Sequence, residues 1–340
     1  MMKENSSVIR HPSSIHIPVL LDRVIETLGD INCKTVIDAT LGAGGYSRRF
    51  LELGATVIAF DRDPTVQKFA DALLAEYPDK FQLINAPFSK LAEPYFKQNI
   101  EDILSFPRRR EQGLKIDGLE INAIVFDLGI SSMQIDTPDR GFSWRFDSPL
   151  DMRMNNNDSS TGLSPLRWRR GGPKDRGSGQ TAADLIEEID QQELSQILRD
   201  YGNLKNARAI AAAVKKHLPQ TTFQLRDLIH NPKDVAPVFQ AIRIAVNDEM
   251  GELERALAAA PELLAPGGIC AAVTFHSLED RIVKQKFREL TTPLGDPKLP
   301  NSSLLTPNFS LLKTYRPDAA ELELNSRARS AHLRAIKRVA

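Results

Sequence analysis

The sequence predicts an α/β fold, a Rossmann-like, doubly wound and mostly parallel sheet interrupted by a small helical domain. Short apolar runs alternate with helical patterns in the N-terminal third and again toward the C-terminus. A Gly-rich segment follows the first of these runs. Strands interleaved with helices of this length form right-handed βαβ units, in which helices cover both faces of a parallel sheet.

The apolar runs that we expect to be strands of the parallel sheet cover residues 35–38, 56–61, 81–84, 123–127 and 269–275. Helical patterns cover residues 46–53, 64–77, 279–290 and, as one long helix, 238–264. Two short strands are expected near residues 310–313 and 331–334. The alternation of strand and helix supports one sheet assembled from both ends of the chain.

The middle of the chain breaks this alternation. Residues 136–182 are rich in Gly, Pro, Asn, Asp, Ser and Arg, and we expect a flexible loop near 155–180. A helical pattern then runs from 181 to about 228. The sequence therefore predicts a first part of the α/β domain over 1–135, an inserted helical substrate-recognition domain over 136–236, and a second part of the α/β domain over 237–340.

The composition is typical of globular proteins and excludes several classes. The 340 residues are 41% hydrophobic and 26% charged, with a formal net charge of zero, so a nucleic-acid surface must arise from local segregation of charge. The only two cysteines, Cys33 and Cys270, argue against a disulfide framework or a zinc site, and we expect no metal. No run approaches the ~18 apolar residues of a membrane helix. We expect a bacterial-type cytoplasmic protein, with an organelle left open.

The Gly-rich loop over 41–46 indicates an adenosine cofactor. Such a loop after the first strand, with an acid at the end of the second, holds adenosine in doubly wound folds. Asp61 stands at about the expected ~20-residue spacing and can accept hydrogen bonds from the ribose hydroxyls. Phe88 follows the third strand and can cover one face of the adenine. A nicotinamide cofactor and S-adenosylmethionine both fit these features.

Two details favour S-adenosylmethionine. Ser47 stands where a dinucleotide fingerprint requires its third glycine. Asp38, Asp61 and Asp127 end three strands, and their charges would repel a pyrophosphate but attract a sulfonium and an ammonium group. The alternative is that these aspartates only cap helices or terminate strands.

The chain resembles the RsmH/MraW family of small-subunit ribosomal RNA cytosine-N4 methyltransferases, which includes mitochondrial relatives. The resemblance rests on an ordered set of motifs along nearly the whole chain: HIPVLL at 16–21, DATLGAGG at 38–45, DRDP at 61–64, DLGISSMQ at 127–134, RGFS at 140–143, PLDMRM at 149–154, FQAIRIAVNDE at 239–249, TFHSLEDRIVK at 274–284 and RARSAHLR at 327–334.

The resemblance implies a class I methyltransferase. It would transfer a methyl group from S-adenosylmethionine to N4 of a cytidine in small-subunit ribosomal RNA, near the decoding centre. The substrate would be the RNA or the assembled small subunit, with a homodimer left open. Carried over by position, the cofactor contacts are Gly44, Gly45, Tyr46, Asp61, Phe88, Asp127 and Gln134. Asp61 and Phe88 agree with the roles inferred above from their chemistry.

The chain departs from the family pattern at several positions. Tyr46 stands where many relatives have His, and its contact is through either its ring or its backbone. Asn203 and Leu204 replace two glutamates, the segment before Phe239 is shorter than usual, and the insertion at 167–172 is atypical. Most of these changes fall in the helical region, so they bear on the RNA target more than on the cofactor.

Methylation of cytosine N4 requires hydrogen-bond acceptors beside the amine, because its lone pair is delocalised into the ring. Catalysis therefore requires that the nitrogen lie in line with the methyl group and that acceptors stabilise the positive charge developing on the nitrogen. Asp127 is the expected catalytic acceptor, with Ser131 and Ser132 beside it. After transfer the proton leaves to Asp127 or water. Binding of the cofactor's amino-acid end is the competing role for Asp127.

The expected RNA contacts are arginines and aromatic residues, which suit phosphates and unstacked bases. Phe142, Trp144 and Phe146 alternate with arginines, although this stretch can instead be a loop packed on its own domain. His276 either contacts the base or is structural. The full set of expected RNA contacts is Arg140, Phe142, Arg145, Arg153, Arg243, His276, Arg281, Arg327 and Arg329.

Two other functions remain as alternatives at this point. A ribosome-assembly factor that binds RNA without methylating it is suggested by Asn203 and the short segment before Phe239. A nicotinamide-dependent oxidoreductase shares the fold, and Ser47 argues against it.

Overall fold

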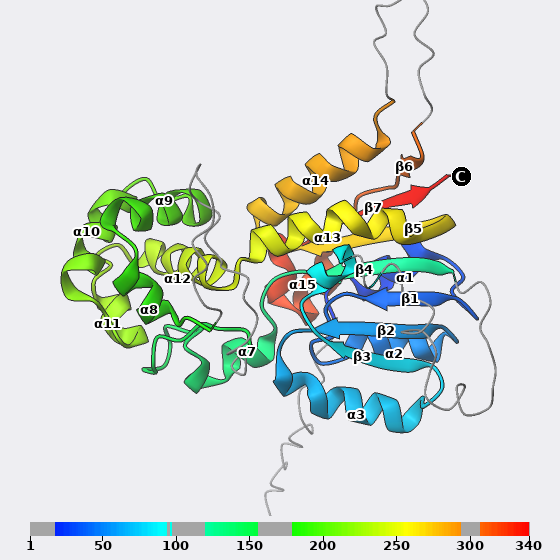
Figure 1. Ribbon diagram of the computed structural model, residues 1–340, viewed down its shortest axis with the longest axis horizontal. Coiled ribbons are helices and arrows are strands. Elements are labelled where there is room, and N and C mark those ends of the chain that lie inside the picture. The colour runs from blue at the N-terminus through cyan, green and yellow to red at the C-terminus, as the bar shows by residue number, and fades with distance from the viewer. Residues whose placement is uncertain (1–17, 94–95, 97–119, 156–178, 294–306, 340) are drawn as a thin grey trace, which may run out of the picture.

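The computed structural model describes residues 18–93, 96, 120–155, 179–293 and 307–339. In these ranges the chain forms one seven-stranded sheet in the order β3-β2-β1-β4-β5-β7-β6 (Figure 1). The strands are β1 (Thr35–Asp38), β2 (Thr56–Asp61), β3 (Phe81–Asn85), β4 (Ile121–Asp127), β5 (Leu264–Thr274), β6 (Phe309–Leu311) and β7 (His332–Arg338). Strands β1 to β5 pair in parallel, and β7 is antiparallel to β5 and β6. The predicted α/β class is confirmed.

Successive residues of each central strand pack on opposite faces of the sheet. Val36, Val57 and Val125 belong to the cluster that includes α1 (Leu21–Leu28), α2 (Gly45–Glu52) and α3 (Gln67–Glu76). Their neighbours Ile37 and Ile58 belong to the cluster with α13 (Glu249–Leu263) and α14 (Ser277–Thr291). Burial on both faces explains why the strands read as continuous apolar runs in the sequence. The short helix α15 (Ala319–Leu324) precedes β7.

The long helix expected over 238–264 is wrong. Two helices, α12 (Pro232–Asn247) and α13, meet at Asp248, whose φ of 48° interrupts them. The apolar pattern continues across the break because each helix buries one face, but in a different cluster. Aspartate tolerates this left-handed conformation better than most residues, and Arg255 Nη2 donates to its carboxylate at 2.7 Å.

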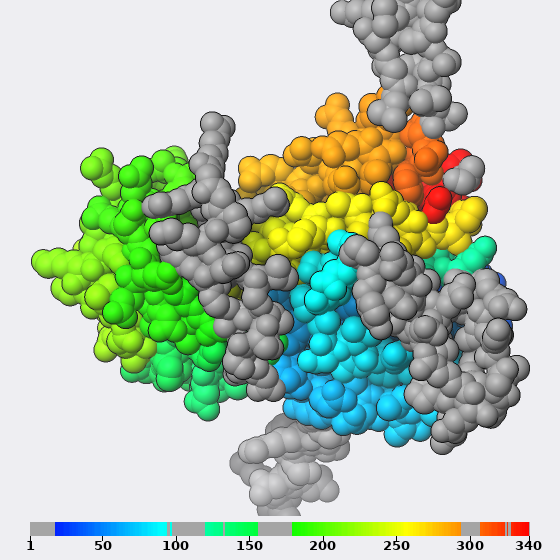
Figure 2. All heavy atoms as spheres, in the orientation of Figure 1, coloured from blue at the N-terminus to red at the C-terminus, as the bar shows by residue number. Residues whose placement is uncertain are grey.

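A second hydrophobic cluster joins residues 142–154 to five helices, and we call residues 142–154 and 182–247 the helical unit. Figure 1 shows its helices as a lobe beside the sheet, with α12 leading into α13, and Figure 2 shows this lobe as spheres. The helices are α8 (Ala182–Glu188), α9 (Gln191–Gly202), α10 (Ala207–His217), α11 (Thr222–Asp227) and α12. The expected boundary at 236 falls inside α12, whose buried face packs in this cluster as far as Ala245.

Two departures from the family pattern have a structural reason in the helical unit. Asn203 ends α9 in the left-handed conformation, with φ of 51°, and Leu204 is buried in the cluster. Asparagine is favoured at such a helix end. The expected loop over 155–180, with its insertion at 167–172, lies mostly outside the described residues. No helix in the described ranges is long and apolar enough to cross a membrane.

Candidate functional site

A cavity of about 530 Å³ lies at the carboxyl ends of β1, β2 and β4, where the strand order reverses. This is where open α/β sheets bind their ligands. One side is formed by the Gly-rich loop, the end of β2 and residues 127–135. The opposite side is formed by residues 142–145, α12, the start of α13 and residues 275–279. The cavity therefore lies between the sheet and the helical unit.

Two positions of the Gly-rich loop disfavour any residue other than glycine. Gly44 has φ of 79°, and a Cβ there would lie 3.1 Å from Leu73. A Cβ on Gly45 would lie 2.3 Å from the Pro18 ring, closer than non-bonded atoms approach. Both glycines are needed for the tight start of α2. Gly45 lines the cavity, and Gly44 forms the turn just before it.

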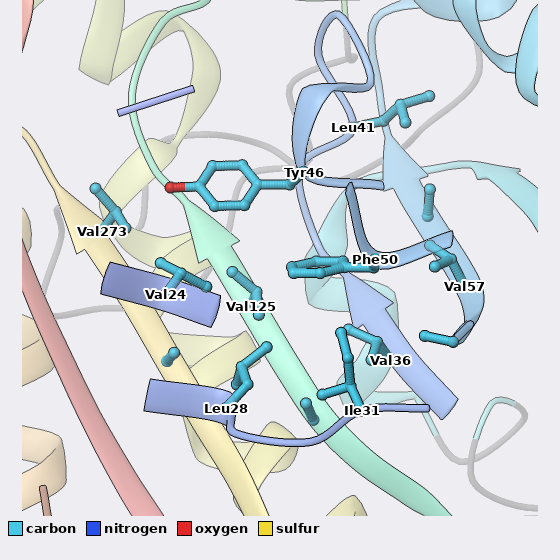
Figure 3. Packing of buried hydrophobic residues seen from close by; sticks show 14 of the residues in the cluster. Val24, Leu28, Ile31, Val36, Leu41, Tyr46, Phe50, Val57, Val125 and Val273 are labelled. Carbon is cyan, nitrogen blue, oxygen red and sulfur yellow. The ribbon is translucent and has the colours of Figure 1, made fainter. Parts of the chain in front are cut away.

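The ring of Tyr46 is part of the hydrophobic core. It is 3% exposed and packs with Phe50 at 6.0 Å between ring centroids (Figure 3). Its hydroxyl donates to the carbonyl of Val19, and burial raises the pKa of Tyr46 well above its usual value. The ring thus holds the N-terminal segment against α2, while Tyr46 also lines the cavity.

Asp61 organises the loop and faces the cavity. Its Oδ2 accepts from Gly42 N at 2.9 Å, and its Oδ1 accepts from Asp63 N at 2.8 Å. Burial raises the pKa of Asp61 to about 6. Each oxygen retains a further lone pair, so the carboxylate can still accept hydrogen bonds from a ligand.

Asp38 does not line the cavity, contrary to the expectation that all three strand-end aspartates face the cofactor. It is fully buried and accepts from Ser47 Oγ at 2.6 Å and Thr40 N at 3.2 Å. Burial raises its pKa to about 6. Ser47, the residue that breaks the dinucleotide fingerprint, therefore helps to hold the loop to β1.

Asp127 lines the cavity with a carboxylate that is incompletely satisfied. Its Oδ1 is buried and has no hydrogen-bond partner in the described part of the chain. Its backbone N–H donates to Thr40 Oγ1 at 2.8 Å, which fixes the end of β4. Burial, with Asp38 and Glu279 nearby, raises the pKa of Asp127 well above its usual value. A cation or an N–H donor in the cavity would supply the missing compensation.

Residues 131–136 form a cap and a short helix beside Asp127. Ser131 caps α7 (Ser132–Asp136), its Oγ accepting from Gln134 N at 3.2 Å. Gln134 Oε1 accepts from Ser131 N at 3.1 Å, and Gln134 Nε2 donates to Asp63 at 2.7 Å. Ser131 and Gln134 line the cavity; the side chain of Ser132 lies outside the described residues. Phe88 lines the cavity too and packs edge-on against Phe126 at 5.6 Å.

Several expected RNA contacts are engaged in ion pairs or in the hydrophobic core. The guanidinium of Arg140 is 7% exposed and pairs with Asp63 at 3.1 Å. Phe142 is buried in the cluster of the helical unit. Arg153 makes a bidentate pair with Asp151 at 2.8 and 2.7 Å. Arg140 and Arg153 are thus engaged in ion pairs, and Phe142 packs in the core while it also lines the cavity.

Arg243 and His276 line the cavity but are also paired. Arg243 makes a bidentate pair with the buried Glu249 at 2.7 and 2.9 Å. His276 begins α14, and its Nε2 lies 2.9 Å from Glu279 Oε1 without an aligned hydrogen bond. Donor atoms of Glu249, His276 and Glu279 lie within 4.8 Å of one another. Arg243 donates to Glu249, and the backbone N–H groups of Phe275 and His276 donate to Glu279 Oε2.

The other expected basic residues divide between the cavity and the outer surface. Arg145 is exposed and lines the cavity beside Trp144. Arg281, on α14, and Arg329 are exposed but do not line it. The side chain of Arg327 lies outside the described residues.

Sequence reasoning missed Asp63, Thr40 and Glu279. All three line the cavity and fix its walls through the bonds described above. Asp63 and Glu279 stand inside the motifs DRDP and TFHSLEDRIVK, but only the fold shows which partners they contact.

Known proteins resemble this chain over nearly its whole length. The model of the MraW methylase family matches residues 13–167 and 174–339. The Ribosomal RNA small subunit methyltransferase H of Brucella anthropi is 38% identical over 336 residues, 94% of this chain and 86% of the relative. That of Caulobacter vibrioides is 40% identical over 341 residues, 95% of each chain.

A solved structure of an rRNA methylase from Streptococcus thermophilus covers 96% of this chain and 100% of its own. It has a TM-score of 0.39 and 10% sequence identity to this chain. The matched length and identity of the sequence relatives are decisive: this chain belongs to the MraW methylase family.

Proposed function

We propose that this chain transfers a methyl group from S-adenosylmethionine to the exocyclic N4 of a cytidine in small-subunit ribosomal RNA. Its relatives carry the name Ribosomal RNA small subunit methyltransferase H and come from bacteria, which supports a bacterial-type cytoplasmic setting. The observation that carries the proposal is the carboxylate of Asp127, which lines the cavity with an oxygen that has no partner among the described residues. Membership in a methylase family argues against the nicotinamide alternative.

The cavity residues fit S-adenosylmethionine. Asp127 and Asp61 present carboxylates, which suit a sulfonium, an ammonium and ribose hydroxyls. Gly45 presents only backbone to the cavity, and Phe88 offers an apolar face for adenine. When bound, the cofactor supplies an electrophilic methyl group. The proposed cofactor contacts are Gly44, Gly45, Tyr46, Asp61, Phe88, Asp127 and Gln134.

Asp127 is proposed to hold the N–H bonds of the cytosine amine. An acceptor at this position orients the nitrogen and stabilises the positive charge that develops on it. Ser131 and Ser132 lie on the same segment as further candidate acceptors. The raised pKa of Asp127 prepares it to receive the proton that the methylated amine loses.

The helical unit is proposed to recognise the RNA. We divide the chain into an α/β domain built from two separate segments and the helical unit inserted between them. The helical unit ends where α12 meets α13, near residue 247. Arg145 is the exposed basic residue at the cavity, and Arg281 and Arg329 are exposed on the adjoining surface. Arg243 and His276 would act from the cavity wall while remaining paired.

The direct test is methyl transfer to small ribosomal subunits that lack the modification, followed by nucleoside analysis. The wild type should yield N4-methylcytidine, and Asp127→Asn should reduce the yield at least about 100-fold, the usual effect of losing one transition-state contact. Absence of N4-methylcytidine with the wild type would refute the function. It would favour the assembly-factor alternative if the protein still bound the subunit.

A further inference from the structure

Buried and partly buried hydrogen bonds form a closed ring between the cofactor side of the cavity and the helical unit. We call this set the inter-unit ring: the side chains of Arg62, Asp63 and Arg140, the backbone of Met154, and Asn247. Arg62 and Asp63 follow Asp61 directly at the end of β2. The ring therefore begins one residue beyond a proposed cofactor contact.

Asp63 is the first member of the ring and is 2% exposed. Its carboxylate accepts from Gln134 Nε2 at 2.7 Å and pairs with Arg140 Nη1 at 3.1 Å. Its backbone N–H donates to Asp61 Oδ1 at 2.8 Å. Asp63 thus contacts two proposed cofactor residues, Asp61 and Gln134, without itself being assigned to the cofactor.

Arg140 carries the connection into the helical unit. Its Nη2 donates to the carbonyls of Arg153 at 3.0 Å and Met154 at 2.9 Å. Met154 N donates to Asn247 Oδ1 at 2.8 Å, and Asn247 O accepts from Arg62 Nη1 at 2.9 Å. Arg62 is the neighbour of Asp63 in the chain, so the ring closes. Arg140, just before the helical unit, and Asn247, at its end, are thus bound to two consecutive residues of one loop.

The backbone beside the ring adopts a strained conformation. Met152 is fully buried with φ of 61°, a region that residues other than glycine rarely occupy. Its N–H donates to Arg140 O at 3.1 Å, and its carbonyl accepts from Asn247 Nδ2 at 2.7 Å. Such a conformation persists only where its surroundings hold it in place. The inter-unit ring supplies that constraint on the segment that leads to the cavity wall.

We propose that the inter-unit ring couples cofactor binding to RNA binding. A cofactor held by Asp61 and Gln134 orders their shared partner Asp63, and Arg140 passes this order to residues 152–154 and to α12. The side of the cavity formed by the helical unit is then ordered before the RNA arrives, which lowers the entropic cost of binding RNA. In this scheme Asp63 and Arg140 are positioning residues. The inference rests on the proposed function.

The first test compares the affinity for small ribosomal subunits with and without saturating S-adenosylhomocysteine. In the wild type the ligand should raise the affinity at least about fivefold, the lower end of typical couplings between sites. In Arg140→Gln this ratio should fall to about one. Arg48→Gln is the matched control, because Arg48 pairs with Glu76 at 2.6 Å on the exposed surface, outside the ring, and should keep the wild-type ratio.

Arg140→Gln leaves the buried charge of Asp63 without its counter-ion and can impair folding. The double variant Asp63→Asn/Arg140→Gln removes both charges and should also show a ratio of about one. A wild-type ratio of one overturns the inference, and so does a wild-type ratio retained in either ring variant.

Amide hydrogen exchange provides a readout that needs no RNA. S-adenosylhomocysteine should slow exchange in residues 150–154 and in the C-terminal half of α12 in the wild type and in Arg48→Gln, but not in the ring variants. Equal protection in all four proteins overturns the coupling even if the wild type methylates subunits. Loss of methylation with the exchange pattern intact would instead count against the proposed function.

Discussion

The end of β4 and the junction between the sheet and the helical unit use their charged residues in opposite ways. On the sheet side, Asp127 presents an oxygen without a partner. On the side of the helical unit, Arg243 and Arg140 are buried in ion pairs with Glu249 and Asp63. Because buried polar groups are normally satisfied, the unpaired group indicates a ligand and the paired groups indicate architecture. This comparison predicts different consequences for substitutions on the two sides.

The largest effect on stability is expected on the helical side, at Arg243. Arg243→Gln leaves Glu249 buried and uncompensated, which should lower the free energy of unfolding by about 3–5 kcal/mol. Urea denaturation measures this loss, and Arg243→Gln/Glu249→Gln should recover part of it. A variant of wild-type stability with weaker RNA binding would show that Arg243 is mainly an RNA contact.

Asp127, in contrast to Arg243, should affect the rate of methylation and not the stability of the protein. Asp127→Asn should lower the single-turnover rate of methylation by about 10²–10³-fold, yet leave the cofactor-free protein as stable as the wild type or more stable. The reason is that Oδ1 has no partner to lose and burial opposes the charge of this carboxylate. The single-turnover rate and the thermal unfolding of the cofactor-free protein together test both parts of this prediction. Marked destabilisation would place Asp127 among the structural residues.

Asp61 has both a structural role in the loop and a proposed role in cofactor binding, and its substitution should have an effect of intermediate size. Asp61→Asn removes charge-assisted bonds to the loop and to the cofactor, so the affinity for S-adenosylmethionine should fall about 10- to 100-fold. Isothermal titration calorimetry measures this affinity. Unchanged affinity would remove Asp61 from the cofactor site and leave it a structural role in the loop.

The raised pKa values on the sheet side predict a pH dependence of both ligand binding and stability. The cofactor requires the ionised form of Asp61, so its affinity should fall as the pH drops below about 6, and Asp61→Asn should be insensitive in this range. Folded Asp38 and Asp61 hold protons more tightly than the unfolded chain. Their contribution to the stability of the cofactor-free protein should therefore decrease as the pH rises from about 4 to about 6. Titrations and urea unfolding at several pH values test both signs.

The smallest effect is expected at Arg145, the exposed basic residue at the cavity. Arg145→Gln should weaken subunit binding only a few-fold, because an exposed charge pair contributes about 1 kcal/mol or less. It should also reduce the dependence of log affinity on log salt by about one. A loss as large as that of Asp127→Asn, or an unchanged salt dependence, would separate Arg145 from phosphate binding.

The strands and the Gly-rich loop were predictable because their signals are local. Apolar runs ending in aspartate identified β1, β2 and β4, and the loop between β1 and α2 followed from its glycines. The break at Asp248 was not predictable from periodicity, since apolar residues continue through it from α12 into α13. Only the packing of the two helices into different clusters distinguishes them.

The sequence by itself determined the fold class, the family motifs and the position of the candidate cofactor site, because these depend on residue type and spacing along the chain. The tertiary structure decided which charged residues remain free. Asp38 and Asp127 look equivalent as strand-end acids, and Arg140 and Arg145 look equivalent as basic residues beside aromatics. Folding pairs Asp38 with Ser47 and Arg140 with Asp63, and leaves Asp127 and Arg145 facing the cavity. Pairing depends on residues distant in the chain that burial brings into contact.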